Sequence, residues 1–202
     1  SSISVAEAVK LMENIFRSVN IALVNELKTI YSKLGIDIWE VIEAAKTKPF
    51  GYMPFYPGPG LGGHCIPIDP YYLTWRAKQV GEETKFIQLA GEINTAMPEK
   101  VVDAMEEALK NQLGKPLKGA HILLAGVAYK KNVDDTRETP AFVLIESMEE
   151  RGATVDYYDP YVPVIPRTRD HGHLAGRKSI EWALEHVGNY DATLICTDHD
   201  GV

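Results

Sequence analysis

Apolar residues recur every three or four positions over the first part of the chain, and this spacing predicts one long helix. Ser4 and Glu7 form a capping box at its start, and Gly35 ends it after about eight turns. The apolar positions are Val5, Val9, Met12, Phe16, Val19, Leu23, Leu27 and Ile30. Residues 20–27 are apolar on more than one face, so we expect the helix to pack against two neighbours and to pair with a second copy of itself.

Shorter helices follow, interrupted by one long irregular stretch. Asp37 and Glu40 repeat the capping pattern of the first helix. The stretch at 47–68 carries five prolines, and a loop of this length is either functional or disordered. Its four aromatic side chains argue against disorder. The predicted helices span 36–46, 70–80, a segment from about 83, and 98–112.

The periodicity changes after a linker that contains Gly114, Pro116 and Gly119. Apolar runs typical of strands then alternate with helical patterns, which indicates a βαβαβ core of a doubly wound parallel sheet. The predicted strands lie within 121–129, 153–159 and 191–198, and the helices at 140–151, capped by Thr139 and ended by Gly152, and at 179–187. We therefore expect an all-α domain over 1–114 and a Rossmann-like α/β domain over 115–202, incomplete at its carboxyl end.

Composition narrows the class of protein. The net charge of −7 and pI of about 5.4 argue against nonspecific nucleic-acid binding, although a few cations could still hold a phosphorylated ligand. No apolar run approaches the roughly 20 residues of a membrane span. The 2 cysteines fit no zinc pattern, and we expect both to be reduced in a cytoplasmic protein that binds no metal.

The segment GPGLGGHCIPIDPYYL, residues 58–73, is the first candidate for chemistry. Cys65 stands in a glycine- and proline-rich loop whose backbone can approach a ligand closely, with Asp69 four residues on. The alternative for Asp69 is a helix N-cap before Pro70, and it could serve both purposes. Cys196, in an apolar strand, is interpreted as a core residue, and His64 is given no catalytic role.

Two further groups of polar residues each have a structural alternative. Lys10 and Asn14 are four positions apart on the long helix and could point at a shared polar site, but the pattern alone favours two surface residues. The turn GVAYKKNVDDTRETP, residues 126–140, has one glycine and so is not a typical NAD-binding fingerprint. Lys130, Lys131 and Arg137 could instead hold a phosphate, or could pair with Asp134 and Asp135 in solvent.

Three segments together resemble the UDP-glucose/GDP-mannose dehydrogenase family, which oxidises C6 of a nucleotide sugar to a carboxylate with two NAD. AEAVKLMENIFRSVNIALVNEL resembles the family's central dimerisation helix, GPGLGGHCIPIDPYYL its catalytic cysteine loop, and GVAYKKNVDDTRETP the opening of its nucleotide-sugar domain. The loop is most similar to the branch that acts on UDP-N-acetylhexosamines, especially UDP-N-acetylglucosamine. Ile68 supports that branch, because UDP-glucose enzymes usually carry lysine there.

The resemblance implies roles by position. Cys65 becomes the nucleophile, Asp69 the base or orienter of the hydrolytic water, and Lys10 and Asn14 stabilise the oxygen that becomes anionic. Arg137 reaches NAD. The substrate-binding residues implied are Phe50, Tyr52, Tyr56, Gly58, Gly60, Gly62, Gly63, Tyr129 and Lys130.

The family's amino-terminal NAD-binding domain is not recognisable in this sequence, so we expect a fragment that does not turn over alone. The expected whole protein is a homodimer, joined through the helix at 5–34, that makes uronic acids for surface polysaccharide. UDP-N-acetylmannosamine and UDP-glucose stay open as substrates. A nucleotide-sugar-binding dimerisation module without redox activity is a further alternative, and a cysteine acyl hydrolase is a third.

Overall fold

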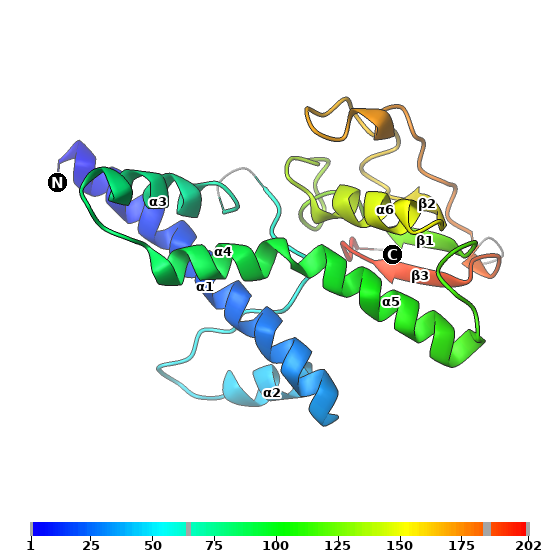
Figure 1. Ribbon diagram of the computed structural model, residues 1–202, viewed down its shortest axis with the longest axis horizontal. Helices are drawn as coiled ribbons and strands as arrows, with labels where there is room; N and C mark the ends of the chain where they lie inside the picture. The colour runs from blue at the N-terminus through cyan, green and yellow to red at the C-terminus, as the bar shows by residue number, and fades with distance from the viewer. Residues whose placement is uncertain (1, 64–65, 184–186, 201–202) are drawn as a thin grey trace. The chain divides into compact units, whose positions relative to one another are not determined.

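The computed structural model describes residues 2–63, 66–183 and 187–200, which belong to two compact units (Figure 1). The helical unit comprises residues 1–58 and 64–97, and the α/β unit comprises residues 59–63 and 98–202. This division differs from the expected boundary after 114. Helix α5 (Met97–Leu113) joins the α/β unit because Val102 and Leu109 are buried in the core of that unit.

Helix α1 (Ile3–Leu34) is the long helix that the apolar spacing predicts. It starts two residues earlier than expected, because Ser2 rather than Ser4 is the N-cap and its side chain accepts from the Val5 N–H. The expected capping box of Ser4 and Glu7 is therefore wrong. Gly35 ends the helix as predicted, with φ at 69°, a left-handed conformation that glycine adopts without strain.

Three shorter helices complete the helical unit: α2 (Ile38–Ala45), α3 (Asp69–Gln79) and α4 (Lys85–Thr95). Asp37 caps α2 through the Trp39 N–H, as expected. Asp69 does not cap α3. The N-cap position belongs to Ile68, and Asp69 is the first helical residue with its carboxylate turned to another partner. The N-cap interpretation of Asp69 is therefore wrong, and its side chain is available for other chemistry.

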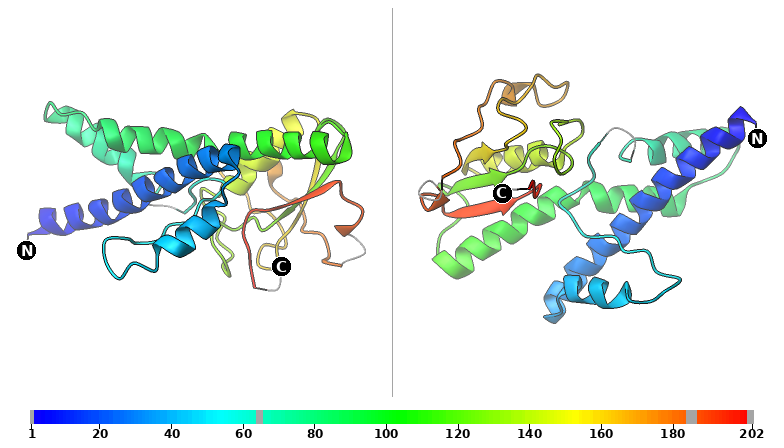
Figure 2. Two further views of the ribbon diagram at one scale, coloured as in Figure 1. Left: turned by 90° about the horizontal axis from the view of Figure 1, so that it is seen from below. Right: turned by 180° about the vertical axis from the view of Figure 1, so that it is seen from behind.

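The face of α1 that packs inside the unit is largely polar. Asn14, Ser18 and Asn25 are at most 1% exposed, and the apolar Ala22 and Val24 are also buried. Helices α2, α3 and α4 all contact α1, as Figure 1 and the further views of Figure 2 show for α4 crossing it and α2 at its carboxyl end. The apolar stripe is left largely exposed, and no helix among the described residues is long and apolar enough to cross a bilayer.

The α/β unit is built on a parallel sheet, as the βαβαβ pattern predicts, and the strands lie in the order β2 (Thr154–Tyr158), β1 (His121–Ala125), β3 (Ala192–Ile195). Ile122 pairs with Val155 on one side and Ala192 on the other. Helix α6 (Pro140–Glu150), capped by Thr139, packs against β2 and joins α5 in one hydrophobic core. The segment η1 (Gly172–Leu174) is a single 3-10 turn.

Two expectations for this unit change. Residues 179–183 are not helical, so the predicted helix at 179–187 is wrong over this part, and 184–186 lie outside the described residues. Instead Ser179 and Ile180 bond to the loop and to β2, with the Ile180 N–H on the Tyr157 carbonyl. Cys196 follows β3 rather than lying in it. It is partly buried, packs against the core, and burial raises the pKa of its thiol to about 12.

Candidate functional site

In the helical unit, the structure brings Asn14 of α1 to Asp69 of α3. The Asn14 Nδ2 donates to Asp69 Oδ2 at 2.5 Å, across 55 residues of sequence. Asn14 is 1% exposed, so its amide is shielded from water and has few alternative partners, whereas Asp69 is partly exposed. Two residues predicted to act together are therefore in direct contact, and the surface alternative for Asn14 is wrong.

Lys10 lies one turn earlier on α1 but is not drawn into this contact. Its side chain is 62% exposed, and its Nζ lies 3.7 Å from Glu13 Oε2. An ion pair of this exposure is weak and breaks at little cost, so Lys10 remains able to turn toward a ligand. The expected nucleophile Cys65, with His64, lies outside the described residues.

Arg17, which the sequence interpretation overlooked, is the second partner of Asn14. Its Nη2 donates to the Asn14 Oδ1 from three residues along α1. Its Nε is buried and has no hydrogen-bond partner among the residues that the structure describes. A signal was available in the sequence, because residues three apart on a helix share a face.

The amino-terminal end of the cysteine loop is tied to α1 by a buried chain of amides. The Gly58 N–H donates to Asn25 Oδ1 at 2.9 Å, Asn25 donates to Asn94 of α4 at 3.2 Å, and Asn94 donates to the Ser18 carbonyl at 2.9 Å. Each amide has its oxygen toward the preceding donor, so the direction of the chain is determined throughout. Gly58, predicted to bind substrate, is thus an anchored point of the loop.

The aromatic residues of the same loop fall into two groups. Tyr56 stacks on Trp39 of α2 at a centroid distance of 5.7 Å, and its hydroxyl donates to Glu43. Phe50 is 83% exposed and Tyr52 is also exposed. Both could contact a ligand, whereas Tyr56 is already fixed against α2.

In the α/β unit, residues 59–63 lie against the turn that follows β1. A Cβ on Gly62 would stand 2.7 Å from the Tyr129 Cβ, and one on Gly63 would stand 3.0 Å from the Tyr129 ring. The Gly63 N–H donates to the Arg137 carbonyl at 3.0 Å, and Gly60 faces Pro140. The glycines therefore allow close approach as predicted, but the partner that the structure shows is the chain's own turn.

The charged residues of this turn behave differently from one another. Lys130 is exposed and has no ion pair within the described part of the chain. Lys131 lies 2.8 Å from Asp200, which raises the pKa of Lys131 and lowers that of Asp200. The Nε and Nη2 of Arg137 donate to the Asp135 carboxylate at 2.6–3.0 Å. The alternative of pairing within the turn thus holds for Arg137, whereas Lys131 pairs with Asp200 outside the turn. Among the described residues of the turn, Lys130 is the cation without an ion pair, and its contact with a phosphate stays a prediction.

A buried carboxylate occupies the position where the turn could have cradled an anion. Asp159, directly after β2, is 1% exposed and His199 is 2% exposed. The His199 Nδ1 accepts from the Asn132 N–H, so its Nε2 is the nitrogen that donates. The donors to Asp159 are Val127 N (2.7 Å), Ala128 N (3.0 Å) and His199 Nε2 (3.1 Å) at Oδ2, and Tyr161 N (2.8 Å) and Val162 N (3.0 Å) at Oδ1. The absence of a glycine fingerprint thus has a structural counterpart, since the protein itself satisfies these backbone groups.

Comparison with known proteins decides the family. The central domain of the UDP-glucose/GDP-mannose dehydrogenase family matches residues 4–96, and the UDP binding domain of the same family matches residues 123–202. The chain belongs to this family. The first match lies in the helical unit apart from residues 59–63, and the second lies in the α/β unit.

Individual members of the UDP-glucose/GDP-mannose dehydrogenase family are also similar. The UDP-N-acetyl-D-mannosamine dehydrogenase of Methanocaldococcus jannaschii is 44% identical over 195 residues, which is 96% of this chain and 40% of the relative. The UDP-N-acetyl-D-glucosamine 6-dehydrogenase of Pseudomonas aeruginosa is 40% identical over 173 residues, 85% of this chain and 40% of the relative. The solved UDP-D-ManNAc dehydrogenase of Pyrococcus horikoshii superposes with a TM-score of 0.82 at 37% identity, covering 96% of this chain and 42% of that structure. The chain therefore spans about two fifths of the length of these relatives.

Among the described residues, no cluster of three or more histidine, cysteine or acidic side chains has the arrangement of a metal site. The groups placed for chemistry are an amide, a carboxylate and nearby cations. Such a set can orient water, accept a proton and stabilise an oxyanion.

Proposed function

We propose that this chain is the substrate-binding and catalytic-cysteine part of an NAD-dependent nucleotide-sugar 6-dehydrogenase. The observation that carries the proposal is the hydrogen bond from the buried Asn14 to Asp69, which stands four positions after Cys65 in a chain of this family. A packing role alone does not require an amide to be joined to a carboxylate that follows a cysteine by four positions in the sequence. A covalent oxidation does require groups of this kind.

The proposed chemistry takes the C6 alcohol to an acid in two oxidations. The alcohol loses a hydride and a proton to give an aldehyde, and the Cys65 thiolate adds to its carbonyl carbon to form a thiohemiacetal. Loss of a second hydride from C6 and of the hydroxyl proton gives a thioester. Water then adds, the C–S bond breaks, and the acid and the thiolate are released. NAD supplies the acceptor for each hydride.

The residues of this chain have separate roles in these reaction steps. Asp69 orients the hydrolytic water and takes its proton. Asn14, with Lys10 turned inward from its exposed position, stabilises the oxygen that carries negative charge when the carbonyl is attacked. A donor of this kind is worth about 10²–10³ in kcat where it has been removed from comparable sites.

The α/β unit does not fit NAD in the usual way, because Asp159 occupies the backbone donors after β1. We therefore assign NAD mainly to protein outside these residues, with Arg137 reaching it. The same turn suits a UDP-sugar better, since Lys130 is exposed and unpaired within the described residues and Tyr129 packs beside Gly62 and Gly63. Phe50 and Tyr52 would cover the sugar.

The proposed substrate is a UDP-N-acetylhexosamine, with UDP-N-acetylglucosamine as the first candidate. The form of the cysteine loop and Ile68 support this class. UDP-N-acetylmannosamine is the second candidate, because the relative that is 44% identical over 195 residues bears that name. The two sugars differ in configuration at C2, which a few contacts would distinguish.

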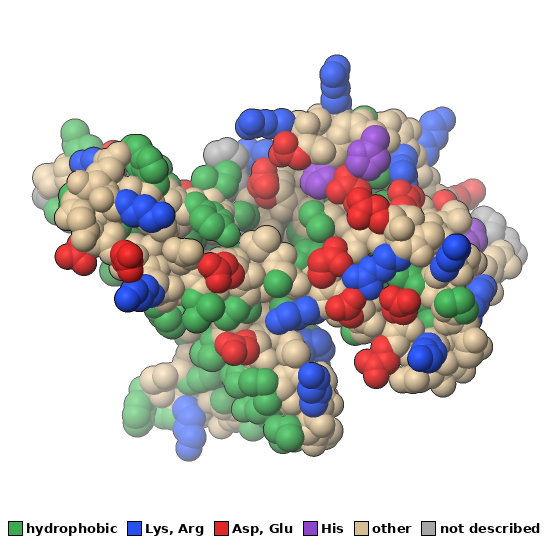
Figure 3. Space-filling view, in the orientation of Figure 1, with side chains coloured by type: hydrophobic (Ala, Val, Ile, Leu, Met, Phe, Trp, Pro, Cys, Tyr) green, Lys and Arg blue, Asp and Glu red, His purple; other side chains and the backbone are tan. Residues whose placement is uncertain are grey.

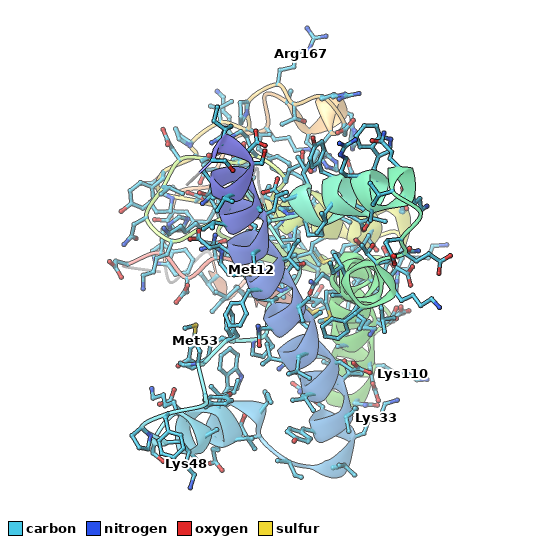
Figure 4. The ribbon with its side chains drawn as sticks, turned by 90° about the vertical axis from the view of Figure 1, so that its left-hand side faces the viewer. Met12, Lys33, Lys48, Met53, Lys110 and Arg167 are labelled. Atoms are coloured by element: carbon cyan, nitrogen blue, oxygen red, sulfur yellow. The ribbon has the colours of Figure 1, made fainter. Side chains whose placement is uncertain are left out.

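The proposed assembly is a homodimer through α1. Its stripe of exposed apolar side chains includes Met12, which Figure 4 labels, at 68% and Leu23 at 52% exposure. Hydrophobic side chains also gather over the carboxyl-terminal half of α1 and over α2 in the space-filling view (Figure 3). An exposed stripe of this length on one helix is typical of an interface.

The decisive experiment uses the full-length gene product that contains this chain. It measures NADH formed per sugar consumed with UDP-N-acetylglucosamine, UDP-N-acetylmannosamine and UDP-glucose in parallel. Two NADH per sugar, and loss of acid formation in Cys65→Ser, are expected. One NADH per sugar would indicate a simple alcohol dehydrogenase, and binding of UDP-sugar without NADH would favour the binding module.

A further inference from the structure

The side-chain amide of Asn14 has contacts on both ends that only one orientation satisfies. At one end Arg17 Nη2 donates to Oδ1, and at the other Nδ2 donates to Asp69 Oδ2. A guanidinium has donors only, so it can face only the oxygen of the amide. A carboxylate accepts only, so it faces the nitrogen. The amide is therefore held between a cation and an anion.

We propose that Arg17 is a positioning residue of the active site, which directs the N–H groups of Asn14 toward Asp69 and the reacting oxygen. The proposal deepens the proposed function and rests on it for its catalytic consequence. Arg17 acts through Asn14 and has no contact with substrate in this scheme. Nothing in its sequence position beyond the three-residue spacing on α1 would assign it this role.

Neither water nor a lysine side chain would replace the Arg17 guanidinium well at the Asn14 Oδ1. Asn14 and its neighbour Ser18 are each 1% exposed, so water cannot easily replace the guanidinium at Oδ1. Arg17 and Asn14 are three residues apart on a regular helix, which places the planar group beside the amide. Lysine has a shorter reach and a single ammonium with no planar fork, and it would have to be desolvated to occupy this site.

A cation at the Asn14 oxygen and an anion at its nitrogen also make the Asn14 N–H groups stronger hydrogen-bond donors. A cation on the carbonyl oxygen withdraws electron density from the amide, and hydrogen bonds in a chain polarise one another. One of the two Nδ2 hydrogens is used by Asp69, and within the described residues the other has no partner, which leaves it for an anionic oxygen. Arg17 thus prepares an amide to stabilise negative charge.

Arg17 itself is energetically unfavourable in this position. Its Nε is buried without a hydrogen-bond partner in the described part of the chain, and no carboxylate there neutralises the guanidinium. Buried donors are nearly always satisfied in folded proteins, so an exception calls for an explanation. A purely structural role would be served better by an apolar side chain of similar length.

The kinetic test uses Arg17→Met in the full-length dehydrogenase. We expect kcat to fall at least tenfold while the KM for UDP-sugar changes less than threefold, with Arg17→Lys recovering little. The matched control is Arg76→Met on α3, an exposed arginine bonded to Gln79, whose kcat should stay within twofold of wild type. In an Asn14→Ala background, Arg17→Met should cause less than a further twofold loss, because its effect passes through that amide. Equal losses in both backgrounds would overturn the proposal.

A second measurement does not depend on activity. In ¹⁵N spectra of the folded protein, the Asn14 side-chain amide is identified by its disappearance in Asn14→Ala. Arg17→Met should shift this signal and increase its exchange with water, without lowering the thermal unfolding midpoint. An unchanged signal would refute the positioning role. A wild-type enzyme that forms no NADH with any nucleotide sugar would instead refute the proposed function, while the amide signal would still decide the orientation.

Discussion

Replacing Asp159 by asparagine should destabilise the α/β unit strongly, although the two side chains have nearly the same shape. The aspartate accepts four backbone N–H bonds and one from His199, with two donors or more at each oxygen. Asparagine has one acceptor oxygen and one NH₂ group. Whichever way its amide is turned, at least two of the N–H groups that point at this side chain will face another donor.

The magnitude follows from the number of donors left unsatisfied. Each buried donor without a partner costs about 1–3 kcal/mol, so two of them cost about 2–6 kcal/mol. His199 cannot relieve the conflict by exchanging its proton between nitrogens, because its Nδ1 already accepts from Asn132. With an m value near 2 kcal/mol per M of urea, the unfolding midpoint should fall by roughly 1–3 M.

The assay can be confined to this unit by its tryptophans. Of the 3 tryptophans, Trp182 alone lies in the α/β unit, with its ring 4.8 Å from that of Tyr158. In a Trp39→Phe, Trp75→Phe background, urea unfolding followed by fluorescence therefore reports on this unit. Asp156→Asn in β2 is the control, since that carboxylate is 42% exposed and water can replace its partners, and it should cost less than about 1 kcal/mol. If Asp159→Asn were no more destabilising than the control, the assigned bonds would be wrong.

Three further predictions test other parts of the chain. Gly126→Ala should lower the free energy of unfolding by more than about 3 kcal/mol, because its Cβ would lie 2.2 Å from the Thr197 carbonyl oxygen. The control Gly119→Ala, at a similar φ but with nothing within 4 Å of its Cβ, should lower it by only about 1–2 kcal/mol. Equal losses of stability in urea would exclude the clash. Met12→Glu or Leu23→Glu should convert the proposed dimer to monomers in analytical sedimentation, because both side chains belong to the exposed apolar stripe. Ala6→Glu, an exposed position outside the stripe, should leave the dimer intact. If all three variants remained dimers, the interface would not lie on this stripe. In a Cys65→Ser background, Cys196 should alkylate slowly at pH 8 until urea is added. Since folding raises the pKa of Cys196 from 9.0 to about 12, the folded state keeps its proton longer, and stability should fall as pH rises above about 9; rapid alkylation of the folded protein would contradict this burial.

Regular elements were predictable because local spacing determines them. Helix α1 ended at Gly35 as expected, and Asp37 and Thr139 cap the helices that they precede in sequence. The parallel pairing of the strands followed from alternation of strands and helices, whereas their order β2–β1–β3 was not predicted. The predicted helix at 179–187 is wrong at its start because Ser179 and Ile180 bond to neighbouring strands and loops, and tertiary contacts outweigh a weak local preference.

The candidate site was only partly predictable, because hydrogen bonds across the fold are not encoded in spacing. The pattern placed Lys10 and Asn14 on one face but could not show that Asn14 is buried against Asp69 while Lys10 stays exposed. Asp159 and His199 stand 40 residues apart, and no short motif links them. Arg17 was visible in sequence only as one polar residue among several on a long helix.

Helix α1 shows why an amphipathic pattern identifies faces but not their partners. Ordinarily the apolar face packs inside and the polar face meets water. Here the buried face carries the polar residues Asn14, Ser18 and Asn25, and the apolar stripe is largely exposed. Asn14 donates to Asp69, Asn25 accepts from the Gly58 N–H, and Ser18 lies beside the Asn94 amide. Burying three polar residues is tolerable only where every group finds a partner, and exposing a continuous apolar stripe is tolerable only where another surface covers it. Both conditions are met if the polar face serves the reaction and the apolar face joins a second copy, so the same helix would set the active-site amide and the dimer axis.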